Sequence, residues 1–407
     1  MRMRYLSELV KNLAFSGQKM AFVSGPRQAG KTTFAKALLK ERGAGAYFNW
    51  DETEFRRTWV KQPKSTIPSP KGGKTPLVVF DEIHKAKLWK RTLKGLFDTL
   101  ESPSDILVTG SARLNVYKKG SDSLLGRYFN FRLHPFTFRE MVLSGDQPVD
   151  SLFDTLRNRA LTPKKEWSEA FAGLMRFGGF PDPLFSQDEK KARLWRRGRM
   201  EKMIREDLRD LSRIPELSRI EMLASLLPEK VGSLFSIASL REHLEVNHET
   251  VKRWVMFLQE LFYLFEIKPY QGSVSRSLKK EGKAYLWDYS EVKEKSARYE
   301  NLIAGHLLKA CHFWTDCGEG EFSLHFIRNK EKQEIDFLVS RDGKPWMAVE
   351  AKWGDGTPSP NWKKFLPSLG NILAVQLVAE PGRWGWTKVA ERDLLVASAQ
   401  EFLAYLV

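Results

Sequence analysis

Short apolar runs alternate with amphipathic stretches over residues 18–135. The apolar runs have the length of buried strands, and the stretches between them repeat apolar residues at helical spacing. We therefore predict strands within 18–25, 44–50, 75–82 and 104–112, and helices over 31–43 and 88–101. Because strands and helices alternate in this order, the pattern predicts an α/β fold with a parallel sheet and right-handed crossovers. Residues 61–75, rich in Pro, Gly and Lys, are predicted to form a solvated loop.

The hydrophobic pattern becomes helical from about residue 137 to about residue 230, interrupted by the turn sequence GGFPDP at 178–183. Residues 233–270 predict two helices joined by a tight turn and followed by a strand. Further on, the pattern predicts a helix over 297–311 and strands over 322–328, 333–339 and 346–352. The sequence thus predicts four parts, with bounds at 1–140, 141–230, 231–290 and 291–407.

The composition indicates a folded, basic protein with a polyanionic partner. The 407 residues include 42% hydrophobic side chains, and 66 Lys and Arg against 50 Asp and Glu give a net charge of +16. Such a charge favours nucleic acid, with an anionic membrane surface as the weaker alternative.

The two cysteines, Cys311 and Cys317, argue against a disulfide framework. No signal peptide or long apolar run is recognised, so we expect a soluble cytoplasmic protein with no membrane partner.

The stretch GPRQAGKTT has the spacing of a phosphate-binding loop between a predicted strand and a predicted helix. Its backbone N–H groups and the helix dipole favour bound phosphates. The predicted nucleotide-binding residues are Gly25, Pro26, Arg27, Gln28, Ala29, Gly30, Lys31, Thr32 and Thr33. Lys31 is expected to neutralise the β and γ oxygens, and Thr32 to bind Mg²⁺.

A second part of the nucleotide site is predicted where the apolar run LVVF ends in two acids. Asp81 is expected to organise the magnesium shell, and Glu82 to polarise the attacking water. Together with the phosphate-binding loop, these acids predict binding and hydrolysis of ATP with Mg²⁺ as cofactor. Ser111, at the end of the next predicted strand, is a candidate contact for the γ-phosphate or the water. Arg127 is a candidate arginine finger across a subunit interface, and Arg113 competes for that role.

The motifs GPRQAGKTT, VVFDEIHK, VTGSAR, LLGRYFNFRLHPFTFRE and GGFPDP resemble, in this order, the prokaryotic AAA+ ATPases that carry a C-terminal nuclease-like domain. The resemblance covers almost the whole chain. It implies Walker A roles for Lys31 and Thr32, Walker B roles for Asp81 and Glu82, and the finger role for Arg127. It also implies self-association into a hexameric ring, because an arginine acting in trans needs a neighbour. Many AAA+ proteins have Asn where Ser111 stands, so the sensor role departs from the family pattern.

Residues 231–290 are predicted to form a winged-helix module. His248, Lys252 and Arg253 are expected early in the second helix, where contacts to a DNA groove are made. The predicted phosphate contacts on the basic loop that follows are Arg276, Lys279, Lys280 and Lys283. The alternative is a module that serves only as a spacer between proteins.

The stretch KQEIDFLVSRDGKPWMAVEAKWG, residues 332–354, predicts two strands joined by a turn. Alternation along the second strand places Glu350 and Lys352 on one face, and Asp336 on the adjacent strand reaches the same point. Two carboxylates suit Mg²⁺, and the lysine orients a water for attack on phosphorus.

This pattern resembles the PD-(D/E)xK core of the restriction-endonuclease-like superfamily. The resemblance makes Asp336, Glu350 and Glu300, on the preceding helix, candidate metal ligands, with Lys352 as a catalytic residue. Glu334 is a fifth, weaker candidate. The alternative is a salt-bridged strand pair that holds DNA or a partner without cutting.

These parts together predict an ATP-hydrolysing protein that remodels or translocates on duplex or branched DNA, with Mg²⁺-dependent cleavage as an open addition. The rival hypothesis is a nucleotide-dependent switch that binds a protein partner and carries a vestigial nuclease-like domain.

Overall fold

The computed structural model describes residues 4–70, 72–111, 124–143, 145, 148–207, 217–271, 280–354 and 356–407. The chain divides into two compact units, Met1–Pro135 and Phe136–Val407, and each is described by itself. The predicted boundary at residue 140 falls close to this division, and the three later predicted parts lie in the second unit. No helix among the described residues is both long enough and apolar enough to cross a membrane.

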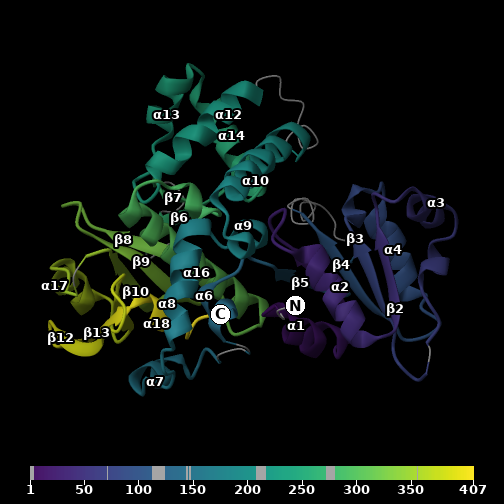
Figure 1. Ribbon diagram of the computed structural model, residues 1–407, viewed down its shortest axis with the longest axis horizontal. Coiled ribbons are helices and arrows are strands. Elements are labelled where there is room, and N and C mark those ends of the chain that lie inside the picture. The colour runs from purple at the N-terminus through teal and green to yellow at the C-terminus, as the bar shows by residue number, and fades with distance from the viewer. Residues whose placement is uncertain are drawn as a thin grey trace. The chain divides into compact units, whose positions relative to one another are not determined.

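The first unit is built on the predicted parallel sheet (Figure 1). Its strands are β1 (Met20–Ser24), β2 (Gly45–Asn49), β3 (Leu77–Asp81), β4 (Asp105–Gly110) and β5 (Tyr128–Arg132). They lie in the order β2-β3-β4-β1-β5, and every neighbouring pair is parallel. The four predicted strands are confirmed. The edge strand β5 was not predicted, because most of its side chains are partly exposed and it lacks a continuous apolar run.

Helices cover both faces of this sheet. They are α1 (Leu6–Leu9), which continues into a π-helical turn at Val10–Phe15, α2 (Lys31–Arg42), α3 (Thr53–Lys61) and α4 (Trp89–Asp98). On one face, aromatic residues of α3 and α4, including Trp59 and Trp89, pack against Phe22, Phe80 and Val108 of the strands. The α2 helix contacts β2, β3 and β4. The predicted loop at 61–75 also holds a short 3₁₀ turn, Pro63–Thr66.

The second unit contains an eight-stranded sheet in the order β12-β13-β11-β10-β9-β8-β6-β7. The strands are β6 (Leu264–Pro269), β7 (Lys283–Leu286), β8 (Phe322–Arg328), β9 (Glu334–Arg341), β10 (Lys344–Lys352), β11 (Leu373–Val378), β12 (Trp384–Val389) and β13 (Arg392–Ser398). The β6/β8, β10/β11 and β11/β13 pairs are parallel, and the others are antiparallel. Because β6 pairs with β8, the sheet continues across the boundary predicted at residue 290.

Among the described residues of the second unit, the α-helices are α6 (Phe138–Val142), α7 (Leu152–Arg157), α8 (Lys165–Phe177), α9 (Pro181–Ser186), α10 (Glu189–Lys202), α12 (Leu217–Leu226), α13 (Ile237–Leu244), α14 (His248–Glu260), α16 (Lys295–Asp316), α17 (Asn361–Phe365) and α18 (Ala399–Leu403). The predicted turn at 178–183 is only partly a turn, since its second half begins α9, with Pro181 in the first helical position.

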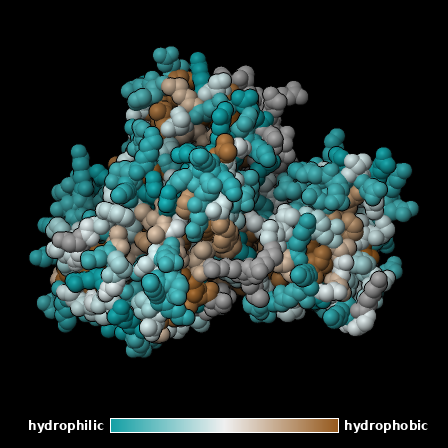
Figure 2. Space-filling model, viewed as in Figure 1, coloured by the Kyte–Doolittle hydropathy of each residue, from teal (hydrophilic) through white to brown (hydrophobic). Residues whose placement is uncertain are grey.

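The long helix α16 contacts β7, β8 and β10 (Figure 1). On the visible face of this unit, hydrophilic residues predominate and apolar residues form smaller groups (Figure 2).

Candidate functional site

The phosphate-binding loop connects the carboxyl end of β1 to the first residue of α2. Gly25 lies close to the residue that follows β5: a Cβ atom at Gly25 would be 2.2 Å from the carbonyl oxygen of Leu133. Gly30, at φ 96°, adopts a left-handed conformation that favours glycine. Gln28 also has a positive φ, 62°. The shape of the loop therefore requires glycine at positions 25 and 30.

Lys31 and Thr32 begin α2, where free backbone N–H groups and the helix dipole favour an anion. The Lys31 side chain is 7% exposed, and its Nζ donates hydrogen bonds to the carbonyl oxygens of Gly25 (3.0 Å) and Pro26 (2.7 Å). Thr32 and Thr33 are exposed on the first turn. The predicted loop residues are therefore assembled at one helix N-terminus.

Asp81, the last residue of β3, is buried and accepts hydrogen bonds from three hydroxyl groups. The donors are Thr32 Oγ1 at 2.6 Å, Thr109 Oγ1 at 2.5 Å and Tyr47 Oη at 2.8 Å. The contact between Thr32 and Asp81 joins the two predicted halves of the nucleotide site. Sequence reasoning missed Tyr47 and Thr109. Thr109 shares a strand face with Ser111, so alternation along β4 offered a signal, whereas Tyr47 offered none.

Glu82 follows Asp81 at the carboxyl edge of the sheet, with a left-handed backbone at φ 59°. Such a conformation is strained for a residue with a side chain, and strained residues concentrate at functional sites. Burial raises the pKa of the Glu82 carboxyl, while the positive charges of Lys31 and Lys85 act in the opposite direction. The His84 Nε2 atom lies 3.6 Å from a Glu82 carboxylate oxygen.

Ser111 is buried directly after β4, at the same edge of the sheet. Arg127, just before β5, makes two hydrogen bonds with Asp98, from Nε at 2.6 Å and from Nη2 at 3.0 Å. Its proposed role in a neighbouring subunit stays a prediction. The competing candidate, Arg113, lies outside the described residues.

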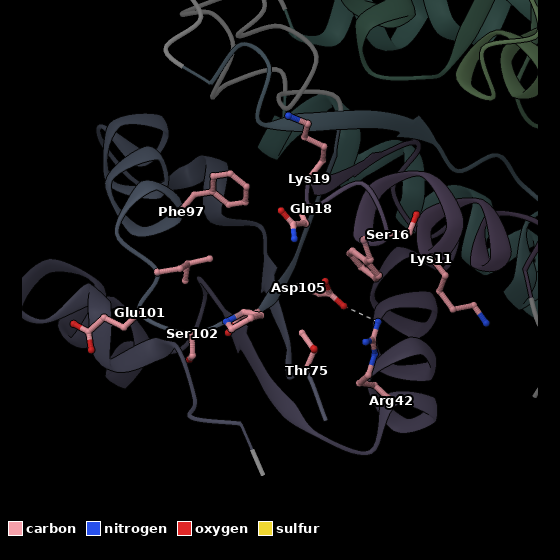
Figure 3. A pocket seen from close by; sticks show the side chains of 14 residues that line it. Lys11, Ser16, Gln18, Lys19, Arg42, Thr75, Phe97, Glu101, Ser102 and Asp105 are labelled. Atoms are coloured by element: carbon pink, nitrogen blue, oxygen red, sulfur yellow. Dashed lines mark ion pairs between the residues drawn. The ribbon is translucent and has the colours of Figure 1, made fainter. Parts of the chain in front are cut away.

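A hollow of about 710 Å³ lies at the opposite, amino end of this sheet (Figure 3). Its wall includes Arg42, Lys11 and Lys19. Arg42 is paired with Asp105 at 2.7 Å, and Lys11 with Glu41 at 2.8 Å. Lys19 donates to the carbonyl oxygen of Gly126. These cations have partners in the chain, and the phosphate-binding residues lie at the other end of the strands.

The predicted helix–turn–helix residues lie on α13 and α14, which are joined by residues 245–247. Asn247 caps α14 by accepting a hydrogen bond from the Thr250 N–H at 2.8 Å. His248, Lys252 and Arg253 are all exposed at the start of this helix, as expected. Lys280 is also exposed, whereas Arg276 and Lys279 lie outside the described residues. Contact of any of these residues with DNA, and the winged-helix assignment, stay predictions.

Lys283 corrects the sequence-based expectation. It was predicted on an exposed basic loop, but it is the first residue of β7 and its side chain is 1% exposed. Its Nζ lies 2.9 Å from Glu334 Oε1, 3.5 Å from Glu300 Oε1 and 3.8 Å from Asp336 Oδ1. A lysine this deeply buried is not available to a DNA phosphate. The expectation failed because composition indicates a basic segment but not which lysine joins a strand.

The residues of the predicted nuclease-like site do meet. In the β9–β10 pair, Phe337 opposes Val349, which brings Asp336 beside Glu350. The Asp336 N–H donates to Glu350 Oε2 at 3.2 Å, and the Ala351 N–H donates to Asp336 Oδ2 at 2.9 Å. Lys352 Nζ lies 2.8 Å from Glu350 Oε1, so Glu350 and Lys352 share a face as predicted.

Burial and crowding alter the acidity of this carboxylate cluster, which comprises Glu300, Glu334, Asp336 and Glu350. Burial, and then the negative charge of Asp336, raise the pKa of Glu300 to about 7 and that of Glu350 to about 7. Burial also raises the pKa of Asp336, against the opposing charge of Lys283. For Lys283 burial lowers the pKa, but the carboxylates outweigh it and the net shift is upward.

The cluster does not fit a metal ion well as it is arranged here. Glu334 is shared between Lys283 and Arg328, whose Nη1 lies 2.8 Å from Oε2, and Glu300 accepts the Tyr285 hydroxyl at 2.7 Å. No three His, Cys, Asp or Glu side chains in the described ranges are positioned to hold one ion. Asp336 and Glu350 remain a two-carboxylate pair.

Comparisons with known proteins agree with the geometry of the first unit. Residues 17–142 match a family described as an AAA domain. This match and the contact between Thr32 and Asp81 define a P-loop ATPase domain of the AAA type. Residues 168–292 and 295–378 match two domains of unknown function, DUF8612 and DUF4143.

Relatives with similar sequences span most of the chain. An uncharacterized protein of Mycobacterium tuberculosis is 23% identical over 402 residues, covering 95% of this chain and 83% of its own. An uncharacterized protein of Haemophilus influenzae is 21% identical over 84% of each chain. Among solved structures, the Walker-type ATPase of Pyrococcus abyssi matches with a TM-score of 0.45 and 15% identity, over 73% of this chain and 96% of that one. DnaA from Aquifex aeolicus bound to AMPPCP matches with a TM-score of 0.31 and 14% identity, over 63% and 86%.

Proposed function

We propose that this protein is an ATP-driven machine that binds and remodels DNA. The observation that carries the motor part is the 2.6 Å contact between Thr32 and Asp81. It brings a hydroxyl at a helix N-terminus and a buried carboxylate to one point, beside Lys31 and Glu82. This is the donor set that phosphoryl transfer from a nucleotide requires.

ATP and Mg²⁺ fit this site by the chemistry of its groups. Thr32 would serve as a metal ligand, Asp81 would order the metal's water shell, and Lys31 would bind the β and γ oxygens. Glu82, at the same carboxyl edge of the sheet, would polarise the attacking water. When bound, Mg²⁺ would supply positive charge that offsets the negative charge of the phosphates.

The DNA part of the proposal rests on exposed cations in the second unit and on the net charge of +16. His248, Lys252 and Arg253 lie together on the exposed start of α14. Lysine and arginine bind phosphates through charge, and the resulting affinity falls steeply with salt. In this proposal α14 contacts duplex or branched DNA while ATP hydrolysis drives remodelling or translocation.

The proposal also includes assembly into a hexameric ring. Arg127 acts there on the nucleotide of the neighbouring subunit, after exchanging its partner Asp98 for a phosphate. Both groups are partly exposed, so water weakens the pair that must be broken.

Strand cleavage is the second candidate activity. It is supported by three residues that follow the PD-(D/E)xK pattern in the sequence and contact one another in the fold: Asp336, Glu350 and Lys352. Lys283 opposes it, since its ammonium group lies among carboxylates that would otherwise face a metal. Incubation of labelled DNA with Mg²⁺, analysed on a denaturing gel, separates these hypotheses: a product that Lys352→Ala abolishes supports cleavage. If the DNA stays intact with both the wild type and Lys352→Ala, the result supports a nuclease-like domain that does not cleave DNA.

The position of Lys283 also favours part of the rival hypothesis, a switch ATPase with a vestigial nuclease-like domain that binds a protein. DNA affinity measured at several salt concentrations discriminates between the two functions. Phosphate contacts give a steep dependence on salt, and a protein-binding module gives a slight one.

ATP turnover by the purified protein tests the main proposal. It should be measured without DNA and with linear duplex, single-stranded DNA and a four-way junction, with Glu82→Gln as the inactive control. We expect at least one DNA to stimulate turnover several-fold. Equal turnover in all four conditions would contradict a DNA motor while leaving the ATPase itself established.

A further inference from the structure

A buried lysine occupies the middle of the carboxylate cluster, and the proposed DNA motor does not account for it. Lys283 comes from β7, Glu300 from α16, and Glu334 and Asp336 from β9. The Lys283 side chain is 1% exposed, whereas the side chains of its three partners are 12–26% exposed. The lysine therefore approaches the carboxylates from inside the protein.

The distances around Lys283 suit an ammonium group. Its 2.9 Å separation from Glu334 is that of a charge-assisted hydrogen bond, and the other two carboxylates lie at 3.5 and 3.8 Å. A magnesium ion instead requires oxygens at about 2.1 Å in near-octahedral geometry. The arrangement is built for a cation with long contacts and few geometric demands.

The local charges support the same view. Four carboxylates (Glu300, Glu334, Asp336 and Glu350) face three cations (Lys283, Arg328 and Lys352), which leaves one formal negative charge. Binding of a divalent ion would make the net formal charge of these groups positive. Without Lys283 the same ion would neutralise the cluster.

A metal ion and the Lys283 ammonium would also be close neighbours. An ion bound to Asp336 Oδ1 at about 2.1 Å would lie no more than about 6 Å from Nζ, since Nζ is 3.8 Å from that oxygen. At such a distance, in a partly buried site, like charges repel strongly.

We infer that Lys283 is the resident cation of this cluster, and that its ammonium takes the place of a divalent metal ion between Glu300, Glu334 and Asp336. The charge of Lys283 keeps divalent ions out of the cluster. This inference is independent of ATP turnover and of DNA binding.

Titration of the full-length, nucleotide-free protein with Mn²⁺, followed by the electron paramagnetic resonance signal of the free ion, tests the inference. We expect Lys283→Met to gain one Mn²⁺ site that the wild type lacks. Adding Asp336→Asn to this variant should remove the gain. Lys283→Arg keeps the positive charge and should gain nothing, and Lys280→Met, an exposed lysine nearby, should behave as the wild type.

Two results would overturn the inference. One is a folded Lys283→Met protein, checked by circular dichroism, that binds no more Mn²⁺ than the wild type. The other needs no Lys283 variant: if Asp336→Asn alone abolishes an Mn²⁺ site of the wild type, metal and lysine coexist in the cluster. Identical Mn²⁺ binding by the wild type and Asp336→Asn supports the inference even if Lys283→Met fails to fold.

Discussion

The replacement of Lys283 by Met should destabilise the second unit in a manner that depends on pH. Methionine has a similar shape, so the main loss is the buried charge. Removing one partner of a buried ion pair typically costs about 3–5 kcal/mol, because the remaining charge has no compensation. Only the 2.9 Å contact with Glu334 is a direct hydrogen bond, and the partners' 12–26% exposure lets water screen them. We therefore expect Lys283→Met to lower the free energy of unfolding by about 3 kcal/mol at pH 8, the lower end of that range.

The pH dependence follows from the carboxylates that Lys283 faces. The folded-state pKa of Lys283 is raised, so its contribution is fully present at pH 8 and is lost only above about pH 10. In the wild type Glu300, with a pKa of about 7, is mostly ionised at pH 8 and protonated at pH 5.5; the charge of Lys283 lowers this pKa, so its removal shifts protonation of Glu300 to higher pH. Fewer anions then face the missing lysine, so the loss of stability should be at least about 1 kcal/mol smaller at pH 5.5.

Equilibrium urea unfolding of the wild type and of Lys283→Met at both pH values measures this difference. Scanning calorimetry provides a second readout, in which 3 kcal/mol corresponds to roughly 5 °C in Tm for a unit of this size. Lys280→Met is the matched control, because Lys280 is exposed. The reasoning is refuted if Lys283→Met costs no more than Lys280→Met at pH 8. It is also refuted if the cost is the same at both pH values.

Three further outcomes are expected. Tyr47→Phe should cost about 1.5 kcal/mol in urea unfolding, since it removes a hydroxyl donor from the buried Asp81; no loss would mean that the contact contributes nothing. Burial lowers the pKa of His306 to about 4, so the unfolded chain binds more protons between about pH 4 and 6.5. Acidification over that range should thus lower the free energy of unfolding of the wild type by about 3 kcal/mol more than that of His306→Gln. Parallel pH profiles of the two proteins would show that His306 does not cause the loss of stability in acid. Lys252→Ala and Arg253→Ala should each lower the slope of log Kd for DNA against log salt by about 1; unchanged slopes would remove these residues from the DNA interface.

The sequence alone determined those parts of the sites that depend on neighbouring residues. A strand, a glycine-rich turn and a helix start are contiguous in the chain, so the loop around Lys31 could be predicted with its fold context. Asp81 was predictable because it ends a continuous apolar run. Alternation along one strand was sufficient to place Glu350 beside Lys352.

Only the tertiary structure decided which distant residues complete these sites. Tyr47 reaches Asp81 because β2 lies beside β3. Lys283 reaches Glu334 because its short strand, β7, belongs to the same sheet as β9. It reaches Glu300 because α16 contacts β7. Strand order and register come from packing over the whole unit, and a shift of one residue turns a side chain from the interior to solvent. A lysine that composition assigns to a DNA-binding surface is therefore, in the folded protein, the buried cation of a carboxylate cluster.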